Sequence, residues 1–159
     1  MKEYVGEPES AEDRQERSAR EVVELLQELR IVLPGVQILF AFLLTVPFAQ
    51  RFAELTGLQR NVFFATLLCT AAATALLIAP SAHHRLLFRQ GAREHRLRVG
   101  NLLTIFGLIF LVPAMVGVIF VITDLMFGLM GAVAVTVLMA LVFGSLWFAL
   151  PLWYRRNGG

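Results

Sequence analysis

The stretch from Asn101 to Tyr154 carries a single charged residue, Asp124. One helix over this stretch would be about 80 Å long at 1.5 Å per residue. The hydrocarbon layer of a bilayer is only about 30 Å thick and is crossed by about 20 apolar residues. We therefore predict two membrane crossings here, joined by a turn at Thr123–Asp124, because threonine and aspartate are good N-cap residues for the helix that follows.

The whole chain has the composition of a membrane protein. Hydrophobic residues make up 57% and charged residues 16% of it, whereas soluble domains carry about 25% charged residues. The sequence predicts an all-α integral membrane four-helix bundle with an amino-terminal cytoplasmic amphipathic helix. We expect a tail and helix over residues 1–30, a transmembrane domain over 31–154 and a short tail over 155–159. The expected spans are Ile31–Ala49, Val62–Ala79, approximately Leu102–Ile122 and approximately Leu125–Leu150.

Arginines predict the orientation of the spans, because cytoplasmic loops carry excess basic residues. Five of them lie between the second and third spans, namely Arg85, Arg89, Arg93, Arg96 and Arg98. Arg30 precedes the first span, and Arg155 and Arg156 follow the last. Arg51 and Arg60 lie on the opposite side. We predict a cell-membrane protein with both termini cytoplasmic; the five loop arginines are topogenic or, alternatively, bind anionic lipid headgroups.

The segment Ser10–Arg30 predicts an amphipathic helix on the cytoplasmic side. Opposite charges recur four residues apart, as in Asp13–Arg17 and Glu16–Arg20, which stabilises an isolated helix. This helix either lies on the protein's own cytoplasmic surface or docks a partner protein. Pro34 follows it, disfavours helix at Leu33 and can bend the chain where the first span begins.

Small and weakly polar residues recur at spacings of four within the spans. Such residues let helices approach closely, and we assign the set Gly128, Ala132, Ala140 and Gly144 to helix packing and self-association into a homo-oligomer. A second interpretation is a polar path through the membrane, formed by Gln37, Thr45, Thr66, Thr70, Thr74 and Thr136. Threonine hydroxyls can also bond carbonyls of their own helix.

No pattern of catalytic residues is evident, so we do not expect an enzyme, a cofactor or a metal site. His83, His84 and His95 lack the spacing of zinc ligands, and Cys69 lies in an apolar run that disfavours a reactive thiolate. A net charge of +2 gives no reason to expect nucleic-acid binding. The expected partners are membrane lipids, further copies of the chain and a protein at the amino-terminal helix.

Two segments, Leu25–Phe52 ("LLQELRIVLPGVQILFAFLLTVPFAQRF") and Ile78–Arg89 ("IAPSAHHRLLFR"), resemble a family of small four-span bacterial membrane proteins of unknown function. Some members of that family are labelled sodium:proton antiporters. The resemblance implies small-ion transport, by cation exchange or through an oligomeric pore. The alternative is a non-transporting scaffold or regulatory subunit that docks a partner through Ser10–Arg30.

Overall fold

The computed structural model describes residues 11–86 and 93–157, and every element in this part of the chain is a helix. The predicted all-α class is therefore confirmed. Three helices are long and apolar enough to cross a membrane, over Leu26–Phe48, Gly57–Ala82 and Val99–Asn157. The structure thus has the character expected of a membrane protein.

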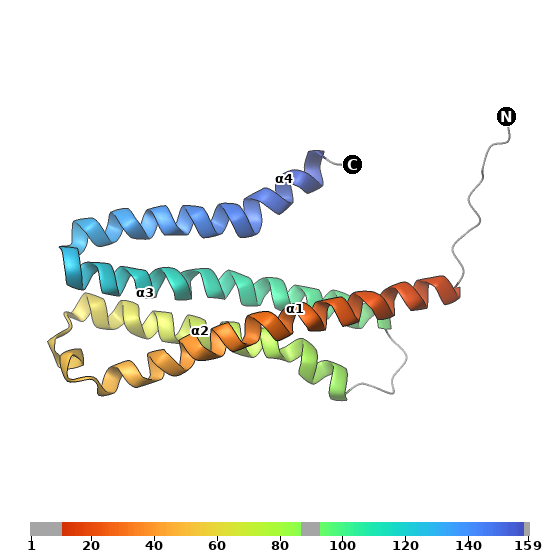
Figure 1. Cartoon of the computed structure of the whole chain (residues 1–159), viewed down its shortest axis with the longest axis horizontal. Helices are drawn as coiled ribbons and strands as arrows, with labels where there is room; N and C mark the ends of the chain where they lie inside the picture. Colours follow the sequence, from red (N-terminus) through yellow and green to blue (C-terminus); the bar gives the residue numbers. More distant parts are fainter. Residues whose placement is uncertain (1–10, 87–92, 158–159) are drawn as a thin grey trace.

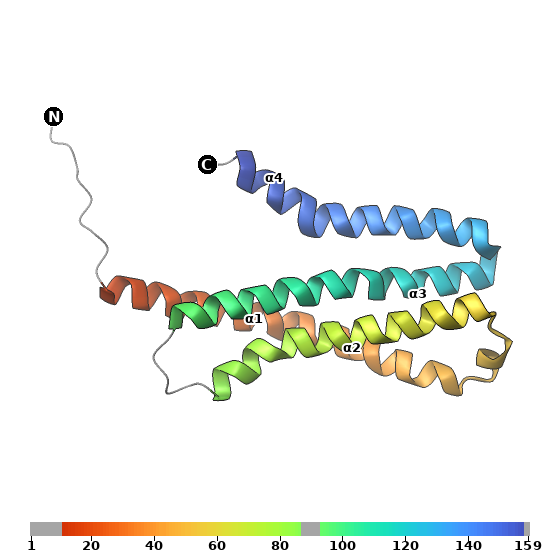
Figure 2. The ribbon, with the colours of Figure 1, turned by 180° about the vertical axis from the view of Figure 1, so that it is seen from behind.

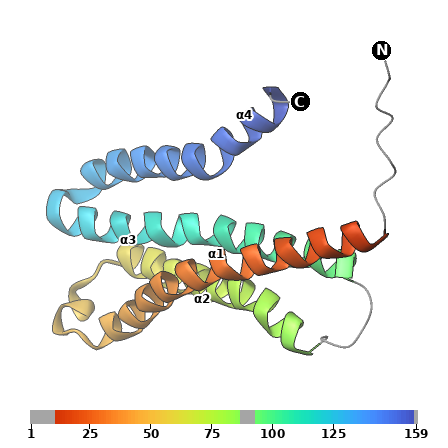
Figure 3. The same cartoon turned by 45° about the vertical axis from the view of Figure 1, so that its right-hand side comes forward.

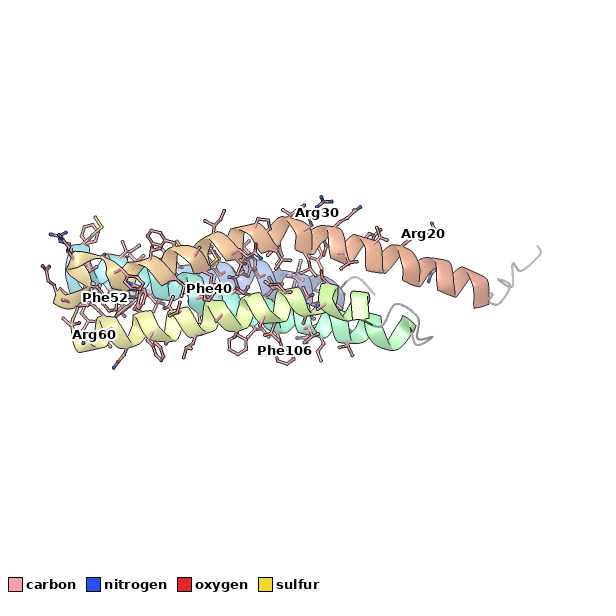
Figure 4. The ribbon with its side chains drawn as sticks, turned by 90° about the horizontal axis from the view of Figure 1, so that it is seen from below. Arg20, Arg30, Phe40, Phe52, Arg60 and Phe106 are labelled. Carbon is pink, nitrogen blue, oxygen red and sulfur yellow. The ribbon has the colours of Figure 1, made fainter. Side chains whose placement is uncertain are left out.

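The first helix, α1, runs from Ala11 to Thr45 without a break. It joins the expected amphipathic helix and the first span in one rod of about 52 Å. The expected boundary at residue 30 falls inside this rod, and Pro34 does not interrupt it. Proline removes one backbone donor, a loss that apolar membrane helices tolerate when neighbouring groups compensate. The start of α1 extends beyond the start of α3 (Figures 1 and 4).

Two short 3-10 turns connect α1 to the second long helix. They are η1, Val46–Phe48, and η2, Gln50–Glu54. Pro47 lies in the first turn of η1, where it cannot donate the hydrogen bond that would continue α1. The next helix, α2, runs from Gly57 to Leu86 and returns antiparallel to α1 (Figure 1).

The third helix, α3, covers Arg93–Gly144 but contains a reversal at Gly128. Gly128 has φ 76° and ψ 177°, a conformation that glycine adopts freely and other residues adopt at a cost. The ribbon turns back there in both views (Figures 1 and 2). The turn predicted at Thr123–Asp124 is therefore wrong, because both residues are helical and the backbone reverses where a residue can take positive φ.

Side-chain packing agrees with this reversal. Trp147, which follows the reversal, packs against the same core cluster as Leu108, which precedes it. The two residues are nearly equidistant from Gly128 along the chain, as in an antiparallel hairpin. Trp147 belongs to η3, a π-helical turn over Ser145–Ala149, and the short helix α4 follows over Leu150–Asn157.

The helices pack along seams with the 3.5-residue repeat of coiled coils. In α1 the buried residues Leu29, Val36 and Leu43 are seven apart. In α2 the buried positions alternate three and four apart, at Gln59, Phe63, Thr66, Thr70, Ala73, Leu77 and Pro80. The interface between α2 and α3 is the most extensive, and Figure 3 shows these two helices running alongside one another.

Large apolar side chains cover the outside of the bundle. Phe106 points away from the other helices (Figure 4) and is 46% exposed. Others include Phe42, Phe64, Leu68, Val137 and Leu141. An apolar exterior around a seam of small and weakly polar residues is the arrangement that suits a lipid environment.

Candidate functional site: a polar junction between α2 and α3

The described bundle contains a polar junction formed by Thr56, Gln59 and Asp124. It begins with a capping box at the start of α2. The backbone N–H of Thr56 donates to Gln59 Oε1 at 2.9 Å, and the backbone N–H of Gln59 donates to Thr56 Oγ1 at 3.3 Å. Threonine followed three residues later by glutamine gives this reciprocal arrangement, which fixes the Gln59 side chain.

The fixed Gln59 amide then links two helices. Its Nε2 donates to Asp124 Oδ2 at 2.8 Å. Gln59 is only 7% exposed, and a buried amide without a partner would cost about 1–3 kcal/mol. Asp124, on the side of α3, therefore accepts a hydrogen bond from this amide. The sequence had suggested that Asp124 caps a helix.

Aromatic and aliphatic side chains surround the junction. The rings of Phe52 and Phe63 meet edge to face, with centroids 5.4 Å apart. Phe63 belongs to a core cluster with Leu43 and Val121. This cluster brings together α1, α2 and α3 near the polar junction, so that the hydrogen bonds lie against an apolar core.

The junction lies at the end of the bundle that also holds η1, η2 and the Gly128 reversal (Figure 1). Figure 4 shows Arg60 and Phe52 at this end, with Arg20 toward the other. An Nη2 of Arg60 donates to the Leu55 carbonyl at 3.5 Å. The geometry makes the junction a peripheral link between helices, because Thr56 and Gln59 lie at the start of α2 and Asp124 lies in α3 just before the reversal.

Farther along α2 from the junction, the interface between α2 and α3 (the α2–α3 seam) is tightly packed. A Cβ on Gly117 would overlap Thr66 Oγ1, and a Cβ on Gly107 would lie 2.7 Å from Leu77 Cγ. Thr70, Ala73 and Ala114 are completely buried. Glycine at these positions permits the close approach that membrane helices use in place of a hydrophobic drive.

The six residues of the proposed polar path are not brought together as a group. Gln37 and Thr45 are exposed, and Thr45 Oγ1 donates to the Phe42 carbonyl at 2.7 Å. In α2, the hydroxyls of Thr66, Thr70 and Thr74 each donate to the carbonyl four residues earlier, at 2.7–2.8 Å. These three donors are satisfied inside their own helix.

The sixth residue, Thr136, differs from the other threonines. Its Oγ1 is inaccessible to solvent and has no hydrogen-bond partner among the described residues. It lies after the Gly128 reversal, outside the α2 series. The Thr136 hydroxyl is therefore a buried polar group, in the part of α3 after Gly128, that has no hydrogen-bond partner among the described residues.

The four residues assigned to helix packing have different surroundings. Gly128 forms the reversal, and no atom lies within 4 Å of a Cβ built on it. Ala132 is completely buried. Ala140 is exposed, and a Cβ on Gly144 would meet no atom within 4 Å. Only Ala132 therefore packs inside the chain, and Ala140 faces outward.

The remaining sequence predictions concern the 80–100 region. The side chains of Arg85, Arg89, Arg93, Arg96 and Arg98, and those of His83, His84 and His95, lie outside the described part of the structure. Across the residues that are described, no three or more His, Cys, Asp or Glu side chains gather as metal ligands would. Cys69 is a half-buried free thiol.

Sequence reasoning missed Gln59, the central residue of the polar junction. The available signal was the Thr56–Gln59 spacing, which is that of a capping box at the start of the second span. The link to Asp124 could not be read from the sequence, because it joins residues 65 positions apart.

Residues 11–151 match the model of DUF6328, a family of unknown function, and the chain belongs to this family. No curated protein and no solved structure matches the chain.

Proposed function

We propose that this member of the DUF6328 family is a four-span protein of the cell membrane that serves as a non-transporting scaffold or regulatory subunit. Four crossings are supported by the Gly128 reversal, which divides the apolar segment Val99–Asn157 into two equal halves. Each half exceeds the roughly 20 residues that cross a bilayer. The distribution of arginines supports a cytoplasmic position for both termini and for the segment 80–100.

The closed α2–α3 seam is the observation that supports a non-transporting role. An ion path needs water or polar ligands along its length. Here Thr66 and Leu77 fill the space facing Gly117 and Gly107, and the threonine hydroxyls are bonded within α2. The polar junction is confined to one end of this interface, and it holds the two helices together.

The docking element of this scaffold is the part of α1 that extends beyond the bundle. Leu29 is the buried residue of α1 nearest its amino terminus among those described. Before it, Val23 is 54% exposed, and Arg20 and Glu24 are also exposed. An exposed helix with both charges and apolar side chains suits recognition of a partner protein.

An ion-flux measurement tests the non-transporting role. Purified protein is placed in liposomes that contain a pH-sensitive dye, and a sodium gradient is applied. We expect the same rate of lumenal pH change as in protein-free liposomes. Exchange that disappears in Asp124→Asn or Glu54→Gln would refute the proposal and identify that carboxylate as part of a carrier.

A site-specific cross-linking experiment tests the docking role. A photoactivatable residue replaces Val23 in α1 or, as a control, Phe64 in α2, which is similarly exposed at 58%. We expect a discrete protein adduct in cells from position 23 and none from position 64, which faces lipid. Absence of an adduct at position 23 would contradict the docking role.

Small-ion transport, by cation exchange or through an oligomeric pore, is the second candidate, and two observations favour it. Asp124 is a carboxylate on an apolar helix, and Thr136 Oγ1 is shielded without a described partner. Polar groups within membrane segments are often functional. The flux measurement above distinguishes sodium–proton exchange from the scaffold.

A further inference from the structure

The last two elements of the chain, η3 and α4, change the direction of the backbone. The Leu150 N–H donates to the carbonyl of Ser145, five residues earlier, which is the π-helical pattern. Pro151 follows at once, and proline in a regular helix would clash with the carbonyl four residues before it. The wider turn accommodates Pro151, and all three views show α4 turning away from α3 (Figures 1, 2 and 3).

The two tryptophans of the chain lie on either side of this bend and have contrasting environments. Trp147 packs against the core cluster of Leu29, Val36, Ala73, Leu77 and Leu111, and its ring lies 5.5 Å from that of Phe143. Trp153 is 59% exposed, and its ring contacts Tyr154 at 5.3 Å. Among the described elements, α4 contacts η3 alone. The bundle therefore ends at Trp147.

The depth of the bend follows from helix length. Trp147 is 19 residues from the Gly128 reversal, or about 29 Å along a helix. The hydrocarbon layer is about 30 Å thick. With Gly128 at one surface of this layer, Trp147 lies close to the other surface, and α4 lies in the headgroup region beyond it.

The side chains of α4 are divided between two faces. At 100° per residue, Leu150, Trp153 and Tyr154 share one face, which also holds Asn157, and Arg155 and Arg156 lie on the opposite face, on either side of Leu152. All residues from Leu150 to Asn157 are exposed. Arginine on one face with tryptophan and leucine on the other is typical of helices that lie in a membrane interface.

We infer that α4 is a binding site for anionic phospholipid headgroups at the cytoplasmic surface of the membrane. Arg155 and Arg156 bind the phosphates, and Leu150, Trp153 and Tyr154 enter the boundary between headgroups and acyl chains. The positive charge of the two arginines complements the negative charge of the cytoplasmic leaflet. This inference rests on the membrane orientation given under Proposed function.

Helix α4 has eight residues and continues η3 without a break. Among the described elements, only η3 contacts it. Burial of its aromatic face at the membrane interface would add apolar contacts that the bundle does not supply.

Single-tryptophan variants of the full chain test the inference. Trp147→Phe leaves Trp153 as the reporter on α4, and Trp153→Phe leaves Trp147 as the reporter on the bundle. Each is placed in phosphatidylcholine bilayers that contain a fixed fraction of brominated phosphatidylglycerol or brominated phosphatidylcholine. Bromines near the headgroup or deep in the acyl chain quench tryptophans at their own depth.

We expect headgroup-proximal bromines to quench Trp153 more than deep bromines do. Phosphatidylglycerol should quench it more than phosphatidylcholine, with a preference of up to about fivefold per arginine. Arg155→Gln with Arg156→Gln should abolish this preference. Arg51→Gln, at the opposite end of the bundle, is the matched control and should leave it unchanged.

Three results would overturn the inference. Equal quenching of Trp153 by the two lipids would exclude recognition of the anionic headgroup. Stronger quenching by deep bromines would show that α4 continues the span. Quenching by aqueous iodide but by neither lipid would place α4 in water, as a protein-binding helix would be. Quenching of Trp147 shows whether the bundle is in the bilayer at all. A bundle outside the bilayer would leave Trp147 unquenched by every brominated lipid, and the proposed membrane location would then be wrong.

Discussion

Replacing Gly107 with alanine should test whether the α2–α3 interface depends on close backbone approach. The new Cβ would lie 2.7 Å from Leu77 Cγ, 2.8 Å from Leu77 Cδ2 and 3.5 Å from the Ala73 carbonyl oxygen. The first distance is at least about 0.8 Å short of ordinary carbon–carbon contact. Leu77 is completely buried, so that its side chain would have to shift within the core to make room.

The expected magnitude is the difference between two opposing effects. Overpacking a well-filled core costs typically about 1–3 kcal/mol. Alanine gains up to about 1 kcal/mol over glycine in helix propensity. The net loss of unfolding free energy for Gly107→Ala should therefore be about 0–2 kcal/mol. Gly35→Ala is the matched control, because no atom lies within 4 Å of a Cβ at that position, and it should be neutral or stabilising.

The assay is reversible unfolding in mixed micelles with increasing SDS, followed by far-UV circular dichroism. A double-mutant cycle with Leu77→Ala identifies the contact. Leu77→Ala alone should cost about 2–5 kcal/mol, but it also removes the atoms that the new methyl group meets. The double variant should therefore lose less stability than the sum of the two single losses.

Two results would refute this reasoning. Equal unfolding free energies of Gly107→Ala and Gly35→Ala would show that α2 and α3 can move apart near residue 107 without loss of stability. Additive losses in the double variant would show that Leu77 is not the group that the methyl meets. Either result would weaken the argument that a closed seam supports a non-transporting role.

Three further predictions follow from the orientation, the polar junction and the outward-facing small residues. In a cysteine-free background, Thr56→Cys should react with an impermeant reagent on whole cells and Ser81→Cys should not; the reverse would invert the orientation. Asp124→Leu should destabilise the bundle by about 1–3 kcal/mol because it leaves the Gln59 amide unpaired, whereas Asp124→Asn keeps an acceptor and should cost less; equal losses in SDS unfolding would contradict the link. Ala140→Leu should reduce oligomer size in light scattering if this exposed residue lies in a self-contact, and an unchanged size would exclude it.

The helical class and the apolar segments follow from local sequence. A backbone in lipid is satisfied by a helix or by a closed barrel. Barrel strands alternate apolar and polar residues, so that a long, continuously apolar run indicates a helix. The approximate limits of the first two spans could be predicted for the same reason. Pro34 was misleading, because a proline's effect on a helix depends on the packing around it.

The position of the reversal required knowledge of backbone conformation. Thr123–Asp124 is the most polar pair in the last apolar run, and polarity alone favours a turn there. In the tertiary structure Asp124 instead accepts a hydrogen bond from the Gln59 amide. The turn lies at Gly128, where glycine can adopt positive φ. The sequence contains both residues but does not show which requirement decides.

The roles of the small residues were also decided by tertiary packing. A four-residue spacing shows that Thr66, Thr70 and Thr74 share a face, and the same holds for Ala132 and Ala140. It does not show what that face meets. Gly117 opposite Thr66, the outward position of Ala140 and the separate environments of Trp147 and Trp153 depend on how helices align in space. The sequence by itself therefore determined that the chain forms apolar helices, because the backbone must be satisfied locally; which residues touch was decided by the tertiary structure, because those contacts join positions far apart in the chain.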